Sequence, residues 1–166
     1  MGARELLKAE NDPFGPTYAC LQARFAIEAF AYELLQDYLF EVSADAMNNW
    51  KPKAILKKLL YIDPDACSPI SLTFEQSTED GGPKREIHLG DSYRFSAAWA
   101  NRMHDALGSF LHPPTIKQTM RGSAANAANA ANVAELARGK AEEALVELER
   151  VLASTLCPSA LIVLLQ

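Results

Sequence analysis

The stretch PTYACLQARFAIEAFAYELLQDYLFEV, residues Pro16–Val42, decides the fold of this chain. Its apolar residues recur three and four positions apart, which is the spacing of one helical face. They form two neighbouring stripes: Leu21, Phe25, Ala29, Tyr32, Leu35 and Leu39 in the first, and Ile27, Phe30, Leu34 and Tyr38 in the second. A helix that is apolar on nearly all sides needs several partners, so the sequence predicts a central helix from near Pro16 to about Val42, capped by Thr17.

Three further segments have a helical pattern and can cover this central helix. The first begins at Pro52 and alternates apolar residues with lysines, and the second spans Ser92–His112. The third, over 115–155, is an alanine-rich long helix or two helices joined at a kink, and its repeat Ala124–Asn132 is compatible with a helix and with a flexible connector. One face of this third helix carries Leu136, Leu145, Leu148 and Leu152.

The middle of the chain changes from helical to alternating spacing. ISLTFEQ (Ile70–Gln76) and REIHL (Arg85–Leu89) place apolar residues at every second position, and a Gly/Pro-rich turn joins them. This pattern predicts a β-hairpin at about 70–90 with one face covered. The apolar run at 160–166 is suited to a strand: either it pairs with the hairpin as a third strand, or the chain is cut from a longer protein.

Together these elements predict a mainly α protein, a helical bundle with a small β-hairpin insertion and a C-terminal strand. A chain of 166 residues is most simply one domain, 1–166, and the helical core is expected over 16–114.

The composition is that of a globular chain outside the membrane. Apolar residues make up 49% and charged residues 22%, and 16 basic against 21 acidic residues give a net charge of −5. The acidic balance argues against binding to duplex DNA, and no apolar run is long enough to span a membrane. The N-terminal segment lacks the apolar core of a secretory signal, and three widely spaced cysteines fit neither a disulfide framework nor a metal knuckle. The sequence therefore predicts a cytoplasmic protein.

Glu28 is the strongest anomaly, because it lies inside an apolar stripe of the central helix. Leu21 lies seven residues before Glu28, and Leu35 lies seven residues after it. A buried carboxylate without a partner is costly. Arg24, one turn earlier, can pair with it. Either the two form an ion pair at the rim of the core, or Arg24 and Glu28 are binding residues that face a polar pocket shared with another helix.

A second group of polar residues lies in NRMHDALGSFLH. Asn101, His104 and Asp105 can lie together on a helix, with Asn101 and Asp105 as further binding candidates, whereas His112 is two turns further along. The histidines are too far apart for a convincing metal site, no serine has a nucleophile motif around it, and no glycine pair opens a phosphate loop. The sequence therefore predicts no metal and no cofactor. His112, in front of two prolines, suits a helix C-terminal cap.

The segments ARFAIEAFAY and LGSFLH resemble the HEPN superfamily of helical domains over residues 16–114. Its non-catalytic relatives carry an arginine and a glutamate on the first helix, here Arg24 and Glu28, and a helix that ends in Gly–small–x–x–His, here at His112. The resemblance implies a dimeric helical bundle. It also implies a relationship to ribonucleases, abortive-infection proteins and toxin–antitoxin components.

Catalytic members of this superfamily separate an arginine from a histidine by four to six residues, and this chain has no such pair. Nine residues separate Arg102 from His112, and one separates it from His104. The resemblance therefore implies a non-catalytic interaction or regulatory domain, part of a larger bacterial defence or toxin–antitoxin type protein. The alternative is a metal-independent ribonuclease, in which His104 or His112 takes the RNA 2′-hydroxyl proton and Arg102 stabilises the phosphorane charge.

The expected partners are proteins, with no contact to a membrane or to a DNA duplex. The apolar face of the 115–155 helix predicts a homodimer, because a slender helix buries such a face and a second chain can cover it. The only concentration of basic residues is KPKAILKK at 51–58, for which a solvated helix face is favoured over an RNA contact.

Overall fold

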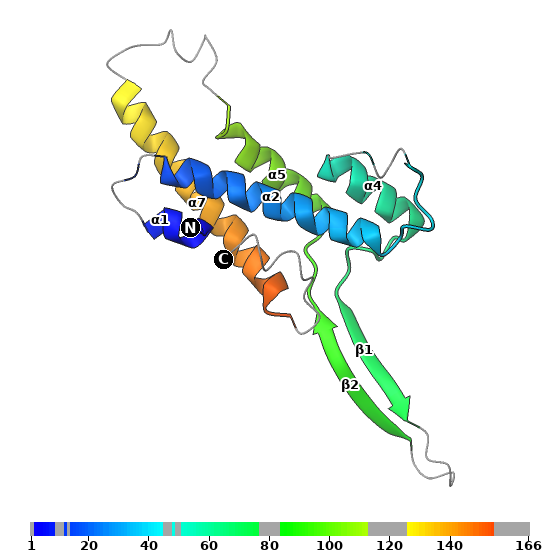
Figure 1. Ribbon diagram of the computed structural model, residues 1–166. Helices are drawn as coiled ribbons and strands as arrows, with labels where there is room; N and C mark the ends of the chain where they lie inside the picture. The colour runs from blue at the N-terminus through cyan, green and yellow to red at the C-terminus, as the bar shows by residue number, and fades with distance from the viewer. Residues whose placement is uncertain are drawn as a thin grey trace.

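The computed structural model describes residues 2–8, 12, 14–44, 48, 51–76, 84–112 and 126–154. The described elements are, in order, α1 (Ala3–Lys8), α2 (Gly15–Gln36), α4 (Pro52–Ile62), β1 (Ile70–Gln76), β2 (Arg85–Ser92), α5 (Ala97–Ser109) and α7 (Asn126–Leu152). The helices form a bundle, and the two strands form a hairpin that extends away from it (Figure 1). The predicted class, a helical bundle with a small hairpin, is confirmed. The strand predicted at 160–166 lies outside the described residues.

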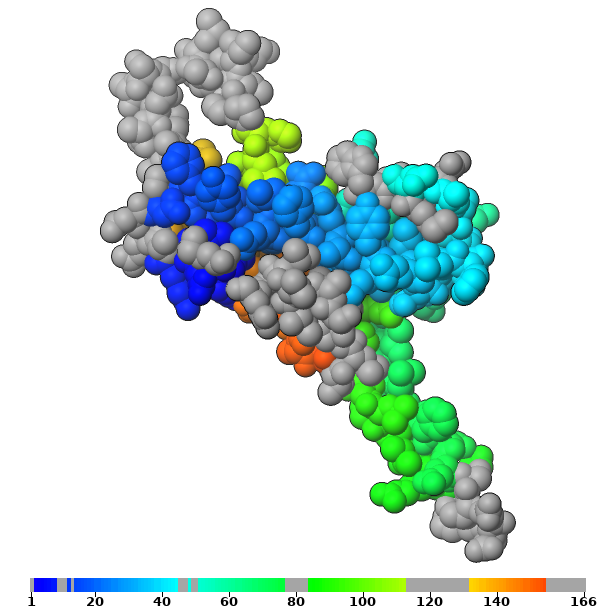
Figure 2. Space-filling model, in the orientation of Figure 1, coloured from blue at the N-terminus to red at the C-terminus, as the bar shows by residue number. Residues whose placement is uncertain are grey.

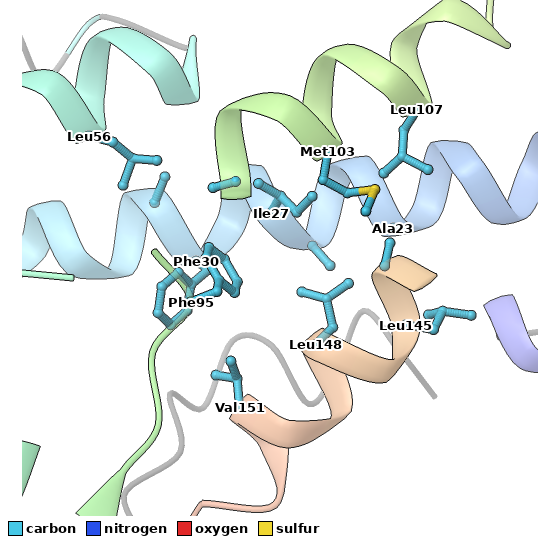
Figure 3. Close-up of a cluster of buried hydrophobic side chains, with 14 of the residues drawn as sticks. Ala23, Ile27, Phe30, Leu56, Phe95, Met103, Leu107, Leu145, Leu148 and Val151 are labelled. Atoms are coloured by element: carbon cyan, nitrogen blue, oxygen red, sulfur yellow. The ribbon is translucent and has the colours of Figure 1, made fainter. Parts of the chain in front are cut away.

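The core of the bundle surrounds α2, as the apolar stripes predict. This helix packs against α1, α4, α5 and α7, and its Ala23, Ile27 and Phe30 are fully buried. Figure 3 shows these three side chains among residues from the other helices and from the segment before α5. The labelled neighbours are Leu56, Phe95, Met103, Leu107, Leu145, Leu148 and Val151. A helix that is buried on several sides obtains its stability from this packing more than from local propensity.

The N-terminus of α2 differs from the prediction, because Phe14 and not Thr17 is the N-cap residue. Pro16 lies in the first helical turn, where its missing N–H has no partner to lose. Gly15 allows α1 to approach closely, since a Cβ atom there would lie 2.6 Å from the carbonyl oxygen of Leu6. The start of α2 is therefore set by a backbone contact with α1.

The C-terminus of α2 is Gln36, so the prediction of a helix that continues to Val42 is wrong. Turn hydrogen bonds follow the helix, and the N–H of Tyr38 donates to the carbonyl oxygen of Leu35 at 3.1 Å. Phe40 is fully exposed and Leu39 is 47% exposed. Another helical turn would bury little of these side chains, so packing provides no reason for the helix to continue.

The helix α4 begins at the predicted residue, whereas α5 is shorter than the predicted segment Ser92–His112, because Ser92 is the last residue of β2 and the helix spans Ala97–Ser109. Pro52 occupies the first turn of α4. Ser96 caps α5, and its hydroxyl oxygen accepts a hydrogen bond from the N–H of Trp99 at 3.2 Å. Just before this cap, the ring of Phe95 lies 4.2 Å from that of Phe30, centroid to centroid, which ties the start of α5 to α2.

The apolar face of α7 is covered by the chain itself, which corrects the argument for a dimer through this face. Leu145 and Leu148 are 1% and 0% exposed, and α7 makes its main contact with α2. Leu136, in contrast, is 62% exposed. The alternative of a flexible connector is wrong for Asn126–Asn132, which is helical, whereas Ala124 and the other residues of 115–125 lie outside the described residues.

The hairpin has the predicted strands but not the predicted covered face. β1 and β2 pair antiparallel, and Phe74 lies opposite Ile87 and Leu72 opposite Gly90. Leu89 has no partner in β1, so β2 carries a bulge there, and Gly90 beside it has φ 148°, a conformation that favours glycine. Every residue of β1 is exposed, and the hairpin stands clear of the bundle (Figure 2). Alternation along a strand therefore does not show that anything covers its apolar side.

Candidate functional site

A polar cluster links α2 to α5 and contains the residues that the sequence singled out. The Nε of Arg24 lies 3.2 Å from Oε1 of Glu28, and Nε2 of His104 lies 2.8 Å from the same oxygen. The three side chains are only 20%, 18% and 12% exposed, respectively. The expected ion pair of Glu28 with Arg24 is present, and His104 of α5 is a second partner of the carboxylate.

The role of one His104 ring nitrogen in this cluster depends on the tautomer. Nε2 of His104 lies 2.9 Å from Nε of Arg24, so it contacts a donor and a carboxylate oxygen at once. With a hydrogen, Nε2 donates to Glu28, and without one it accepts the N–H of Arg24. The carboxylate of Glu28 also lies 3.2 Å from Nε of Arg24, so its charge has a partner within the chain.

The backbone of α5 provides room for this cluster. A Cβ atom on Gly108 would lie 2.7 Å from Nη1 of Arg24, so the guanidinium lies against a position without a side chain. This use of the glycine in LGSFLH was not foreseen from the sequence. It shows that Gly108 belongs to the Arg24 contact, one turn after His104 on the same helix.

The two other binding candidates lie beside the cluster and are not part of its hydrogen bonds. Oδ1 of Asp105 is 3.8 Å from Nδ1 of His104, and the Asp105 side chain is 74% exposed. Oδ1 of Asn101 is buried and has no hydrogen-bond partner in the described part of the chain. Tyr32 lies one turn after Glu28, and burial, together with the charge of Glu28, raises the pKa of its hydroxyl.

The candidate catalytic residues do not come together. Arg102 and His104 lie two positions apart on α5, so they point to nearly opposite sides of the helix. Arg102 is exposed, whereas His104 faces α2. His112 is exposed and lies in the turn beyond Ser109, the last residue of α5. The carbonyl groups at this helix end receive the N–H of Phe110, so the described contacts give His112 no role as a cap.

A second polar cluster, which the sequence analysis missed, joins the ends of α2 and α4 to the segment before α5. Arg94 is 13% exposed, and its Nη1 donates to the carbonyl oxygen of Ala66 at 2.6 Å. Its Nη2 lies 3.8 Å from Oδ2 of Asp37. The hydroxyl of Tyr38 donates a short hydrogen bond to Asp63, which raises the pKa of Tyr38 to about 12 and lowers the pKa of Asp63. These residues come from segments that are distant in the sequence. The only feature of the sequence that pointed to this cluster was Tyr38, which ends an apolar stripe of the central helix.

An open groove of about 460 Å³ lies between the root of the hairpin and the end of α7. Two of its polar side chains, Tyr93 and Arg150, share a partner. The hydroxyl of Tyr93 donates to Glu147 at 2.6 Å, and the guanidinium of Arg150 lies 4.3 Å from the centre of the Tyr93 ring. Arg150 also pairs with Glu147 at 3.1 Å. The charge of Arg150 is therefore compensated within the chain.

The hairpin is the largest feature whose apolar side chains have no partner among the described elements. Its exposed apolar residues are Ile70 (36%), Leu72 (45%), Phe74 (66%), Ile87 (38%) and Leu89 (53%). Soluble proteins rarely expose apolar side chains in such a continuous group unless it contacts a partner. A two-stranded hairpin is also marginally stable by itself in water. We therefore regard this surface as a candidate protein interface.

Other classes of site receive no support from the described residues. Within them, no three His, Cys, Asp or Glu side chains are grouped so that they could hold a metal ion. No helix of the described part is both long and apolar enough to cross a membrane. Comparison of the chain with family models, with curated proteins and with solved structures found no match.

Proposed function

We propose that this chain is a non-catalytic, HEPN-like helical domain that acts by binding protein, and that the hairpin is its binding element. The main observation in support of this proposal is that the apolar side chains of β1 and β2 are exposed. Phe74 and Leu72 are 66% and 45% exposed, although the same chain buries Phe30 and Phe95 almost completely. A chain that can bury large apolar residues in its bundle leaves a continuous group of them in water on one projecting element.

The polar cluster supports this proposal because its charges are compensated internally. Glu28 lies within hydrogen-bond distance of both Arg24 and His104, so the charge of the carboxylate is compensated within the chain. The cluster is better explained as a contact that fixes α5 on α2. The bundle then serves as a rigid base for the hairpin.

Affinity capture tests the proposal. The tagged chain, its double variant Leu72→Ser/Phe74→Ser and the control variant Phe40→Ser are each incubated with a lysate of the native cells. Phe40 is fully exposed but lies outside the hairpin, so this variant controls for nonspecific binding by exposed apolar side chains. We expect at least one protein, other than copies of this chain, to be retained by the wild type and by Phe40→Ser and to be lost from the double variant. Identical sets for all three would contradict the proposal.

A second candidate function is metal-independent RNA cleavage, favoured by the 2.9 Å approach of Arg24 to His104. A cation and an imidazole at this distance are the groups that such chemistry uses, although the arginine is Arg24 and not the expected Arg102. Incubation of RNA with the purified chain in metal-free buffer tests it. We expect no cleavage. Cleavage that both His104→Ala and Arg24→Ala abolish would favour this second function.

A further inference from the structure

The two sides of the hairpin differ in chemistry. Residues directly opposite each other in an antiparallel pair project to the same side, so Phe74 and Ile87 share one side with Leu72 and Ile70. No charged residue interrupts this set along Ile70–Phe74. We call these four residues the apolar face of the hairpin.

The opposite side is charged and needs water. Glu75 lies directly opposite Glu86, and like charges in that position repel each other. Lys84 compensates them in part, with its Nζ 2.7 Å from Oε2 of Glu75. Thr73 and His88 form another pair on this side. A partner that covered this side would bury two carboxylates, so contact is expected on the apolar face.

The size of the apolar face fits a second copy of this chain. Covering its four residues and the adjacent Leu89 on two copies would remove roughly 1,000 Å² from water, which is about the minimum for a biological interface and fits a weak dimer. The face also combines a protruding ring, Phe74, with a position that has no side chain, Gly90, which lies opposite Leu72 on the same side. A surface with both a protrusion and a gap can fit a copy of itself across a two-fold axis.

The position of the hairpin permits this arrangement. The strands extend away from the bundle, so the apolar face lies on a projecting element (Figure 1). We infer that the apolar face is a dimerisation surface, on which two hairpins pack face to face and their charged sides remain in water. This inference rests on the proposed function, because it names a second copy as one partner of the hairpin. It moves the expected dimer contact from α7, whose apolar face α2 covers, to the strands.

Molar mass as a function of protein concentration tests the inference. The wild type should rise from the monomer mass of 18.2 kDa towards twice that value over the micromolar range. Leu72→Glu places a carboxylate in the interface, so we expect dimerisation at least about 100-fold weaker. Thr73→Glu adds the same charge to the next residue of β1, on the charged side, and should dimerise as the wild type does.

Cross-linking tests the orientation of the two copies. In a Cys157→Ser background, Leu72→Cys should be joined to its copy by a bismaleimide that spans the roughly 10 Å between packed sheets. Thr73→Cys should not be joined, and the buried Cys20 and Cys67 should not react.

The outcomes separate the inference from the proposed function. A wild type that stays monomeric while hairpin-dependent capture of other proteins persists overturns the dimer alone. Equal loss of dimer in Leu72→Glu and Thr73→Glu overturns the assignment to the apolar face. If the Leu72→Ser/Phe74→Ser variant captures the same proteins as the wild type, the proposed function is overturned as well.

Discussion

The bundle and the hairpin use the same kinds of apolar residue in opposite ways. In the bundle, Leu148 and Phe30 are fully buried around α2, whereas in the hairpin Leu72 and Phe74 are 45% and 66% exposed. Burial is the main source of folding free energy, so the bundle residues stabilise the fold and the hairpin residues contribute little to it. The difference teaches that apolar surface beyond the core requires an explanation other than folding. The predictions below test this contrast between the two regions.

The largest expected effect is in the bundle. Leu148→Ala removes a fully buried side chain between α7 and α2 and should lower the free energy of unfolding by about 2–5 kcal/mol. The melting temperature should fall by roughly 5–15 °C, measured by circular dichroism. Leu136→Ala, on the same helix but 62% exposed, is the matched control and should change the free energy of unfolding by less than about 0.5 kcal/mol. Equal losses would show that the core is not where the structure places it.

The next effect is at the contact between α2 and α5. Glu28→Ala leaves Arg24 and His104 without their shared acceptor and should cost about 1–3 kcal/mol in a denaturant titration. Glu28→Gln retains an acceptor oxygen and should recover part of this loss. Glu135→Ala removes an exposed carboxylate of α7 as a control. If Glu28→Ala costs no more than this control, the cluster does not hold α5 on α2.

A smaller effect is expected where α2 ends. Tyr38→Phe removes the hydrogen bond to Asp63 and should cost about 1 kcal/mol near neutral pH. The folded-state pKa of Tyr38 is raised to about 12 by this hydrogen bond, so its contribution is fully present below the ordinary tyrosine pKa of about 10 and is lost as the pH rises towards 12. The difference in unfolding free energy between wild type and variant should therefore shrink across this range. A constant difference would contradict the assignment.

The smallest effect is expected in the hairpin. Leu72→Ser should change the free energy of unfolding by less than about 0.5 kcal/mol in dilute protein, because the bundle does not cover this side chain. Thermal melts of wild type and variant at low concentration measure it. A loss comparable to that of Leu148→Ala would mean that the chain itself buries the apolar face.

The sequence predicted the fold where local spacing and core packing agree. The two apolar stripes of α2, the first turn at Pro52 and the alternation in the strands all led to the observed elements. The end of α2 could not be predicted, because Leu39 and Phe40 continue the apolar pattern although they are 47% and fully exposed, respectively. Spacing reports which side of an element is apolar, and only the tertiary arrangement decides whether that side is buried.

The polar sites show the same limit. Glu28 stood out because a carboxylate inside an apolar stripe requires a partner, and Arg24 was one helical turn away. His104 was in the predicted segment, but its contact with Glu28 depends on how α5 crosses α2. The contacts of Arg94 with Ala66 and Asp37 join segments with no regular spacing, so no pattern along the chain could indicate them.

Hydrogen exchange of the backbone amides tests the contrast between bundle and hairpin most directly. In protein dilute enough to be monomeric, amides of Ala19–Leu35 should exchange only through global unfolding, because α2 is surrounded by other helices. Amides of β1 and β2 should exchange much faster, and they should slow as the concentration rises and partners cover the apolar face. Hairpin amides that exchange as slowly as those of α2 in dilute monomer would show that the chain covers its own hairpin and would contradict the account.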